Sequence, residues 1–183
     1  KGVIDAVDGE LARIRKTPSH VGRYWDTVAD TIGLIVVMFA FGQFLDWSYL
    51  LTVVLIMAIL FQYSLFNHFS VRARMIGSGD TTSRVDEKIC PVAQPWEKQQ
   101  YVDIFHKIYL FGFLWQDQII DSIVGKGSTR LSFELTVSSL LGYGFQSILI
   151  LALAFDSNIE LLPELILGFN IGLMFLVVLR SYF

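Results

Sequence analysis

Apolar residues run almost without interruption through four segments of the chain, separated by polar stretches. The segments cover residues 21–45, 47–66, 131–155 and 159–179. A helix rises about 1.5 Å per residue, so each segment is long enough to cross a hydrocarbon core about 30 Å thick. Gln62, in the second segment, is expected to hydrogen-bond to a neighbouring helix. The pattern predicts an all-α fold, a polytopic membrane helix bundle with four complete spans.

The first span reaches this length only when its polar end is included. Its purely apolar part, Thr31–Phe44, is too short to cross the bilayer. Extending the helix back through Asp30 and Asp26 gives sufficient length and places both aspartates within or at the edge of the membrane. An aspartate in a membrane helix costs about 2.5–3.5 kcal/mol on insertion scales, so it usually faces a cavity or a partner. Asp26 and Asp30 are therefore candidate functional residues; the alternative is a pair of carboxylates in the headgroup region.

The segment 70–130 between the second and third spans is polar to amphipathic. Residues 77–83 predict a flexible loop, and they lack the spacing and lysine of a phosphate-binding P-loop. From Trp96 to Val124 apolar residues return at helical spacing. The apolar centre of this part is short and lies between Lys107 and Asp117. We expect an interfacial amphipathic helix on the cytosolic side, or a helix packed on the bundle, rather than a fifth span.

Composition supports a membrane protein and limits the kinds of partner. Hydrophobic residues make up 54% of the chain and charged residues 17%, with a mean hydropathy of +0.54. The formal net charge of −3 gives no reason to expect a nucleic-acid partner. Cys90 is the single cysteine, which excludes an internal disulfide framework.

The distribution of positive charge predicts the orientation. With four spans, the first thirty residues, the segment 70–130 and the C-terminal end share one side of the membrane. All 14 Lys and Arg residues lie on that side, whereas the turns near Asp46 and at 156–160 carry only acids. By the positive-inside rule, the first thirty residues face the cytosol, in the plasma or inner membrane if the protein is prokaryotic.

Four aspartates near the start of the chain form two pairs at helical spacing. Asp5 and Asp8 are three residues apart on a predicted helix, Val3–Arg15, and Asp26 and Asp30 are four apart on the next. Each pair therefore shares one helix face. Two helices facing each other present four carboxylates, a set of hard oxygen ligands that suits Mg²⁺, Mn²⁺ or Ca²⁺. For either pair alone, a solvated helix surface is the alternative.

The acids belong to a longer pattern, Asp-x2-Asp-Gly-x2-Ala-Arg-x8-Gly-x3-Asp-x3-Asp. A chance match to its eight positions is on the order of 10⁻¹⁰ per starting point at average residue usage of about one in twenty. The pattern resembles the signature of the CDP-alcohol phosphotransferase family. The chain matches it at Asp5, Asp8, Gly9, Ala12, Arg13, Gly22, Asp26 and Asp30.

The resemblance implies an activity and a set of roles. Family members transfer a substituted phosphate from a CDP-alcohol, such as CDP-diacylglycerol, to an acceptor hydroxyl and release CMP in phospholipid biosynthesis. The implied metal ligands, for two Mg²⁺ or Mn²⁺ ions, are Asp5, Asp8, Asp26 and Asp30. Asp30 is also the implied general base. The residues implied to contact the CDP moiety are Gly9, Ala12, Arg13 and Gly22.

The resemblance also implies an architecture. The family has a six-helix membrane core, so we expect residues 1–183 to be a single membrane domain whose upstream helix or helices precede this sequence. A homodimer is expected on the same ground, and at least one of the two alcohol substrates is expected to be a lipid.

Two other functions are compatible with paired aspartates in a membrane protein. A divalent-cation transporter explains the acids and the spans, but it predicts acids continuing across the bilayer, and residues 32–45 contain no charge. A catalytically silent scaffold of the same family is the second alternative, and the complete set of four aspartates argues against it.

Overall fold

The structure is a computed structural model that describes Leu11, Ile14, Thr17 and the ranges 19–77, 89–124, 131–155 and 158–182. Helices account for the regular structure in these ranges, and no strand occurs in them. The elements are α2 (His20–Phe44), α3 (Tyr49–Gly77), α4 (Gln99–Val124), α5 (Leu131–Ser138), η1 (Ser139–Leu141), α6 (Tyr143–Phe155), η2 (Ile159–Leu161) and α7 (Leu162–Tyr182).

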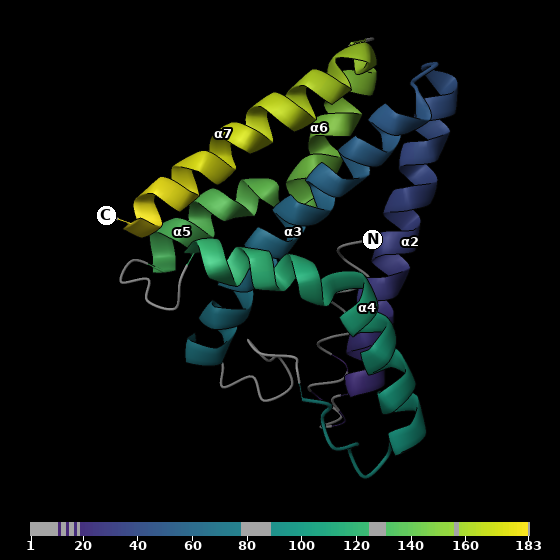
Figure 1. The fold of residues 1–183 in the computed structure, drawn as a ribbon, viewed down its shortest axis with the longest axis vertical. Helices are drawn as coiled ribbons and strands as arrows, with labels where there is room; N and C mark the ends of the chain where they lie inside the picture. The colour runs from purple at the N-terminus through teal and green to yellow at the C-terminus, as the bar shows by residue number, and fades with distance from the viewer. Residues whose placement is uncertain are drawn as a thin grey trace.

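Four helical segments have the length and hydropathy of membrane spans, which confirms the predicted fold class. They are His20–Phe44, Tyr49–Arg74, Ser132–Phe155 and Ile159–Leu179. Helix α4 is not among them. In Figure 1, α2 and α3 meet at one end of the molecule and diverge toward the other, where α4 packs against both. The first part of α4 runs beside the beginning of α2, and its second part crosses α3, whereas α6 and α7 cover another side of α3.

Three clusters of buried side chains hold these helices together. One joins α2, α3 and α7 at the end where α2 and α3 meet, a second joins α3, α4, η1 and α7, and a third joins α2 to α4. The buried members are Met38, Leu55, Ile56, Ile59, Leu60, Leu162 and Ile166 in the first cluster; Leu65, Phe69, Ile120, Val124, Leu141 and Val177 in the second; and Tyr24, Tyr109 and Phe113 in the third.

A cluster of three amides adds a polar connection inside the bundle. The Nε2 of Gln146 on α6 donates hydrogen bonds to Oε1 of Gln62 on α3 (2.9 Å) and to Oδ1 of Asn170 on α7 (3.2 Å). All three side chains are buried. Hydrocarbon gives membrane helices no hydrophobic reason to associate, so such bonds and close packing must hold them together. The hydrogen bond expected between Gln62 and a neighbouring helix is confirmed.

The turn between α2 and α3 depends on a close approach at Gly42. The Trp47 backbone N–H donates to the Gly42 carbonyl (2.8 Å), and Asp46 adopts a positive φ of 52°. A Cβ built on Gly42 would lie 2.6 Å from the Oγ1 of Thr52, which is itself buried. Only glycine allows α2 and α3 to approach this closely.

Gly42→Ala is expected to destabilise the protein by about 1–3 kcal/mol, because the added methyl overpacks the contact with Thr52. Thermal unfolding of the purified protein in detergent measures the effect. Gly33→Ala is the matched control, since a Cβ on Gly33, also in α2, has no neighbouring atom within 4 Å. Equal unfolding temperatures for the two variants would contradict the packing described for the turn.

One predicted boundary differs from the structure. The second span is predicted to end at Phe66, but α3 continues to Gly77 and its candidate span to Arg74. Polar contacts with α4 lie on both sides of Phe66: the hydroxyl of Ser64 donates to Oε1 of Gln116 (3.1 Å), and His68, in the extension, pairs with Asp121 (3.0 Å). Long-range polar contacts therefore maintain the helix beyond the point where the apolar run ends.

The third predicted span is one apolar run in the sequence but not one helix. Residues 131–155 divide into α5, η1 and α6. Near the break, the hydroxyls of Ser138 and Ser139 donate to the carbonyls of Leu135 (3.2 Å) and Thr136 (2.7 Å). Gly142 then adopts an extended conformation with ψ 157°. Serines that bond to their own backbone favour bends in a helix. A Cβ on Gly142 would lie 3.2 Å from the Ser139 carbonyl oxygen and 3.3 Å from the Phe66 ring, so the break also leaves little room for a side chain there.

Candidate active site

The beginning of α2 is held by a carboxylate from a distant part of the chain. Ser19 is the N-cap residue, and its hydroxyl accepts a hydrogen bond from the Gly22 N–H (2.8 Å). The same hydroxyl donates to Oε1 of Glu97 (2.7 Å), and the Val21 N–H donates to that oxygen as well (2.9 Å). A carboxylate at a helix N-terminus is favoured both by the exposed N–H groups and by the helix dipole. Glu97 therefore fixes the end of α2 that carries the motif.

These hydrogen bonds also change the acidity of Glu97. Partial burial raises the pKa of its carboxyl group. The backbone N–H of Val21 and the hydroxyl of Ser19 lower it, as do the N–H groups of His20 and Gln94, and together they outweigh burial. The pKa of Glu97 is therefore below its ordinary value, and folding favours the ionised carboxylate.

The stabilising effect of Glu97 is expected to depend on pH. Because its pKa is lower in the folded state, the contribution is fully present above the unfolded value near 4.3 and is lost as pH falls through the lower folded value. Glu97→Gln should unfold at a lower temperature than the parent protein at pH 7, and the difference should shrink below about pH 4. Thermal unfolding between these pH values measures it. A difference that does not change with pH would contradict the role of the carboxylate.

Three of the motif residues lie in the described part of α2 and share one face of it. Gly22, Asp26 and Asp30 follow one another at intervals of four. Asp26 is exposed, whereas Asp30 is half-buried and its Oδ1 is fully buried. The nearby hydroxyls of Thr27 and Thr31 donate to backbone carbonyls of α2 itself. This face of α2 thus carries two carboxylates one turn apart, an exposed one at Asp26 and a half-buried one at Asp30.

Aromatic packing against α4 supports the beginning of α2. The Tyr24 ring is fully buried, and its centroid lies 5.3 Å from that of Tyr109 and 5.7 Å from that of His106, both on α4. Trp25 meets Phe105 of α4 edge-on at 5.7 Å. Tilted and edge-to-face pairs at such distances are favourable. Helix α4 therefore packs against the part of α2 that carries Asp26 and Asp30 and holds it in place.

The other five motif residues, Asp5, Asp8, Gly9, Ala12 and Arg13, lie outside the described residues. Within the ranges that the structure describes, no three His, Cys, Asp or Glu side chains form a group that could hold a metal ion. The meeting of four carboxylates at one site therefore stays a prediction. The two described members, Asp26 and Asp30, supply only carboxylate oxygens, the donors that Mg²⁺ and Mn²⁺ prefer.

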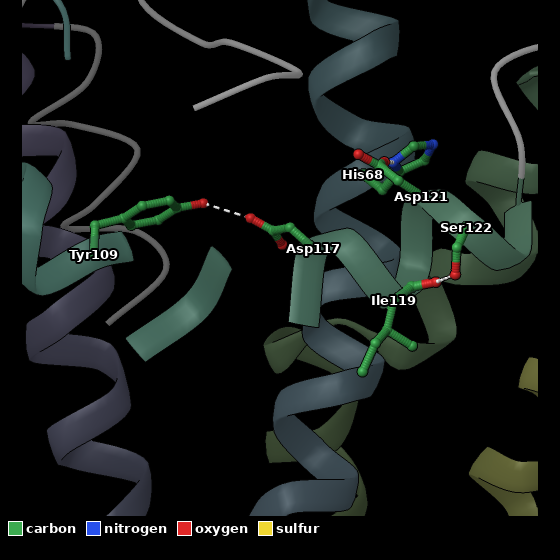
Figure 2. A network of polar contacts seen from close by, with 6 residues as sticks. All are labelled: His68, Tyr109, Asp117, Ile119, Asp121 and Ser122. Atoms are coloured by element: carbon green, nitrogen blue, oxygen red, sulfur yellow. Dashed lines mark hydrogen bonds and ion pairs between the residues drawn. The ribbon is translucent and has the colours of Figure 1, made fainter. Parts of the chain in front are cut away.

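A second polar site, between α3 and α4, could not be read from the sequence. Figure 2 shows the phenol of Tyr109 donating to Oδ2 of Asp117 (2.9 Å) and Nδ1 of His68 close to Oδ1 of Asp121 (3.0 Å). Together with Asn67, these four residues line a cavity of about 30 Å³. That volume suits one or two water molecules rather than an organic substrate. The pair of His68 and Asp121 ties the polar end of α3 to α4, and these two residues are too far apart in sequence for any local signal. Tyr109 and Asp117 both belong to α4.

A larger groove, of about 710 Å³, runs between α3 and the α5–η1 segment. Among the residues that line it, Arg74 is the one with a charged side chain. The lining residues come from α3, α5 and η1, and none comes from α2. The groove is therefore separate from the motif face.

The fold and the motif face together define a class: an integral membrane protein of the all-helical type, with two aspartates at the polar end of a spanning helix. The sequence profile of the CDP-alcohol phosphatidyltransferase family matches residues 1–155. The chain belongs to this family, which confirms the resemblance found in the motif. No curated protein and no solved structure gave a significant match.

Membership of the family gives the general activity. The protein is a transferase of the CDP-alcohol phosphatidyltransferase type, embedded in the membrane, with a CDP-alcohol substrate and an alcohol acceptor in phospholipid biosynthesis.

Proposed function

We propose that the protein transfers a phosphatidyl group from CDP-diacylglycerol to the hydroxyl of an acceptor alcohol and releases CMP. The observation that carries the proposal is the motif face of α2, on which Gly22, Asp26 and Asp30 lie in line at the polar end of a candidate span. A site at the edge of the membrane suits a reaction in which a lipid enters sideways and a polar alcohol enters from the aqueous side.

In the proposed reaction, the acceptor oxygen bonds to the phosphorus that carries the diacylglycerol. The bond from that phosphorus to the CMP oxygen breaks, and Asp30 takes the acceptor's proton. The position of Asp30 supports this role: its side chain is half-buried on the motif face, with Oδ1 buried, so an acceptor hydroxyl bound there is partly shielded from water. Asp26 is exposed and lies one turn before Asp30 on the same face of α2.

The proposed metal ligands are Asp5, Asp8, Asp26 and Asp30, and two Mg²⁺ or Mn²⁺ ions bound there would neutralise the diphosphate and polarise the phosphorus. We assign the CDP moiety to Gly9, Ala12, Arg13 and Gly22. Gly22 has a structural role as well: a Cβ there would lie 3.2 Å from Oγ of Ser19, the atom that also contacts Glu97.

The proposal includes orientation and assembly. We assign the site to the cytosolic face, because all 14 Lys and Arg residues fall on the side of the motif when the four spans alternate. The proposed assembly is a homodimer, an expectation that comes from the family resemblance.

Asp30→Asn is expected to reduce CMP release by about 100-fold or more, because it removes the base while keeping the shape of the side chain. The measurement is CMP formation by purified protein in lipid, with CDP-diacylglycerol and a panel of acceptor alcohols. Asp46→Asn is the matched control: it makes the same chemical change at an exposed aspartate in the turn at the other end of α2. Substantial turnover by Asp30→Asn, with one acceptor that the parent protein uses, would refute the role given to Asp30.

Removal of divalent ions is expected to abolish CMP release, and Mg²⁺ or Mn²⁺ should restore it. Dialysis against EDTA followed by titration with each ion tests this. The same protein in liposomes provides the comparison with a cation transporter: metal-dependent ion flux without CMP release would favour transport. Full CMP release in EDTA would contradict the proposed metal site.

A further inference from the structure

Helix α4 has two apolar faces, and only one of them is covered by the bundle. The covered face packs against α2 and α3. Its buried residues are Val102, His106, Tyr109, Phe113, Gln116, Ile120 and Val124. The second face is exposed, and its residues follow one another at intervals of three or four. This exposed stripe consists of Tyr101, Ile104, Ile108, Phe111, Trp115 and Ile119.

The exposed fraction of the stripe's side chains is large for aromatic and aliphatic residues. Phe111, at its centre, is 91% exposed, and Tyr101 and Ile104 are each more than half exposed. A contiguous apolar surface of this size on one helix marks a contact with another apolar phase or partner. The remaining side of α4 is polar and carries Asp103, Lys107 and Gln118. The helix therefore has one side for the bundle, one for water and one apolar side uncovered.

The stripe is continuous with the surface of the membrane spans. Near its beginning, Phe105 of α4 contacts Trp25, an exposed residue of span α2. Farther along, Trp115 meets Phe61 of span α3 edge-on at 5.4 Å. The first contact lies at the polar end of α2, on the side of the motif, and the second lies near the middle of α3. The stripe therefore adjoins the surface of both candidate spans.

We propose that the exposed stripe of α4 lies in the membrane interface, with its side chains at the boundary between headgroups and acyl chains of the leaflet on the side of the motif. Tyr and Trp are enriched at this depth, and a helix with an apolar side and a charged side lies in the plane of the interface. The acids of α4 explain why it does not span: Asp103 on its polar side, and Asp117 and Asp121 toward α3, would be costly in the hydrocarbon core.

The position of α4 in the membrane interface affects the position of the motif face, because α4 contacts the beginning of α2. Glu97, which holds the beginning of α2, lies two residues before α4, and Tyr109 packs on Tyr24 behind Asp26. A helix anchored in the interface and joined to α2 at both points sets the depth at which Asp26 and Asp30 meet the lipid surface.

The test places an environment-sensitive label at one residue of the stripe. Phe111→Cys, in the full chain with Cys90→Ser, is labelled with bimane and reconstituted in nanodiscs whose lipids carry bromine on the upper acyl chain. The control is Lys98→Cys, at an exposed lysine directly before α4. We expect several-fold stronger quenching by brominated lipid at position 111 than at 98, and the reverse order for quenching by iodide in the water. Circular dichroism and gel filtration establish that both labelled proteins are folded, and neither readout depends on catalytic activity.

Two results would overturn the proposal. Efficient iodide quenching at position 111, with no effect of brominated lipid, would mean that the stripe faces water. Protection from both quenchers, together with cross-linking of Phe111→Cys between two chains, would mean that a second copy covers the stripe instead of lipid.

Discussion

The position of the motif depends on the contact between one carboxylate and the first turn of α2. Oε1 of Glu97 accepts hydrogen bonds from the hydroxyl of Ser19 and the N–H of Val21, and Ser19 in turn accepts one from Gly22, the first described motif residue. Without this contact, the end of α2 that reaches into the polar phase would be held mainly by aromatic packing on α4. The aspartates that follow, Asp26 and Asp30, are therefore placed by a residue that takes no part in the proposed chemistry.

The other helices of the bundle are held together by close packing and hydrogen bonds, because helices in a membrane gain little by burying apolar surface against each other. Close approach at Gly42 joins α2 to α3, and the Gln146 amide joins α3 to α6 and α7. Toward the polar end, His68 of α3 pairs with Asp121 of α4, and Tyr109 and Asp117 of α4 line the same small cavity. The contacts between helices become more polar from the turn at Gly42 toward the motif. The same direction is expected to lead from the bilayer to water.

The sequence predicted the features that depend on local spacing. Apolar runs marked the four spans, and the intervals of four residues placed Gly22, Asp26 and Asp30 on one face of α2. It did not predict features decided by distant partners. Glu97 reaches Ser19 across 78 residues of chain, and no local pattern connects them. The break at residues 139–142 was missed because the apolar run continues through it, and hydropathy does not register serines that bond to their own backbone.

The most direct test of the account is to follow the acceptor's oxygen through the reaction. An acceptor alcohol carrying oxygen-18 in its hydroxyl group is supplied with CDP-diacylglycerol and divalent metal, and both products are analysed by mass spectrometry. The account predicts that the label appears in the phosphodiester product and that CMP remains unlabelled, because the acceptor oxygen attacks the phosphorus bearing the lipid. Label in CMP, or release of CMP without any labelled phosphodiester, would contradict transfer to the acceptor hydroxyl.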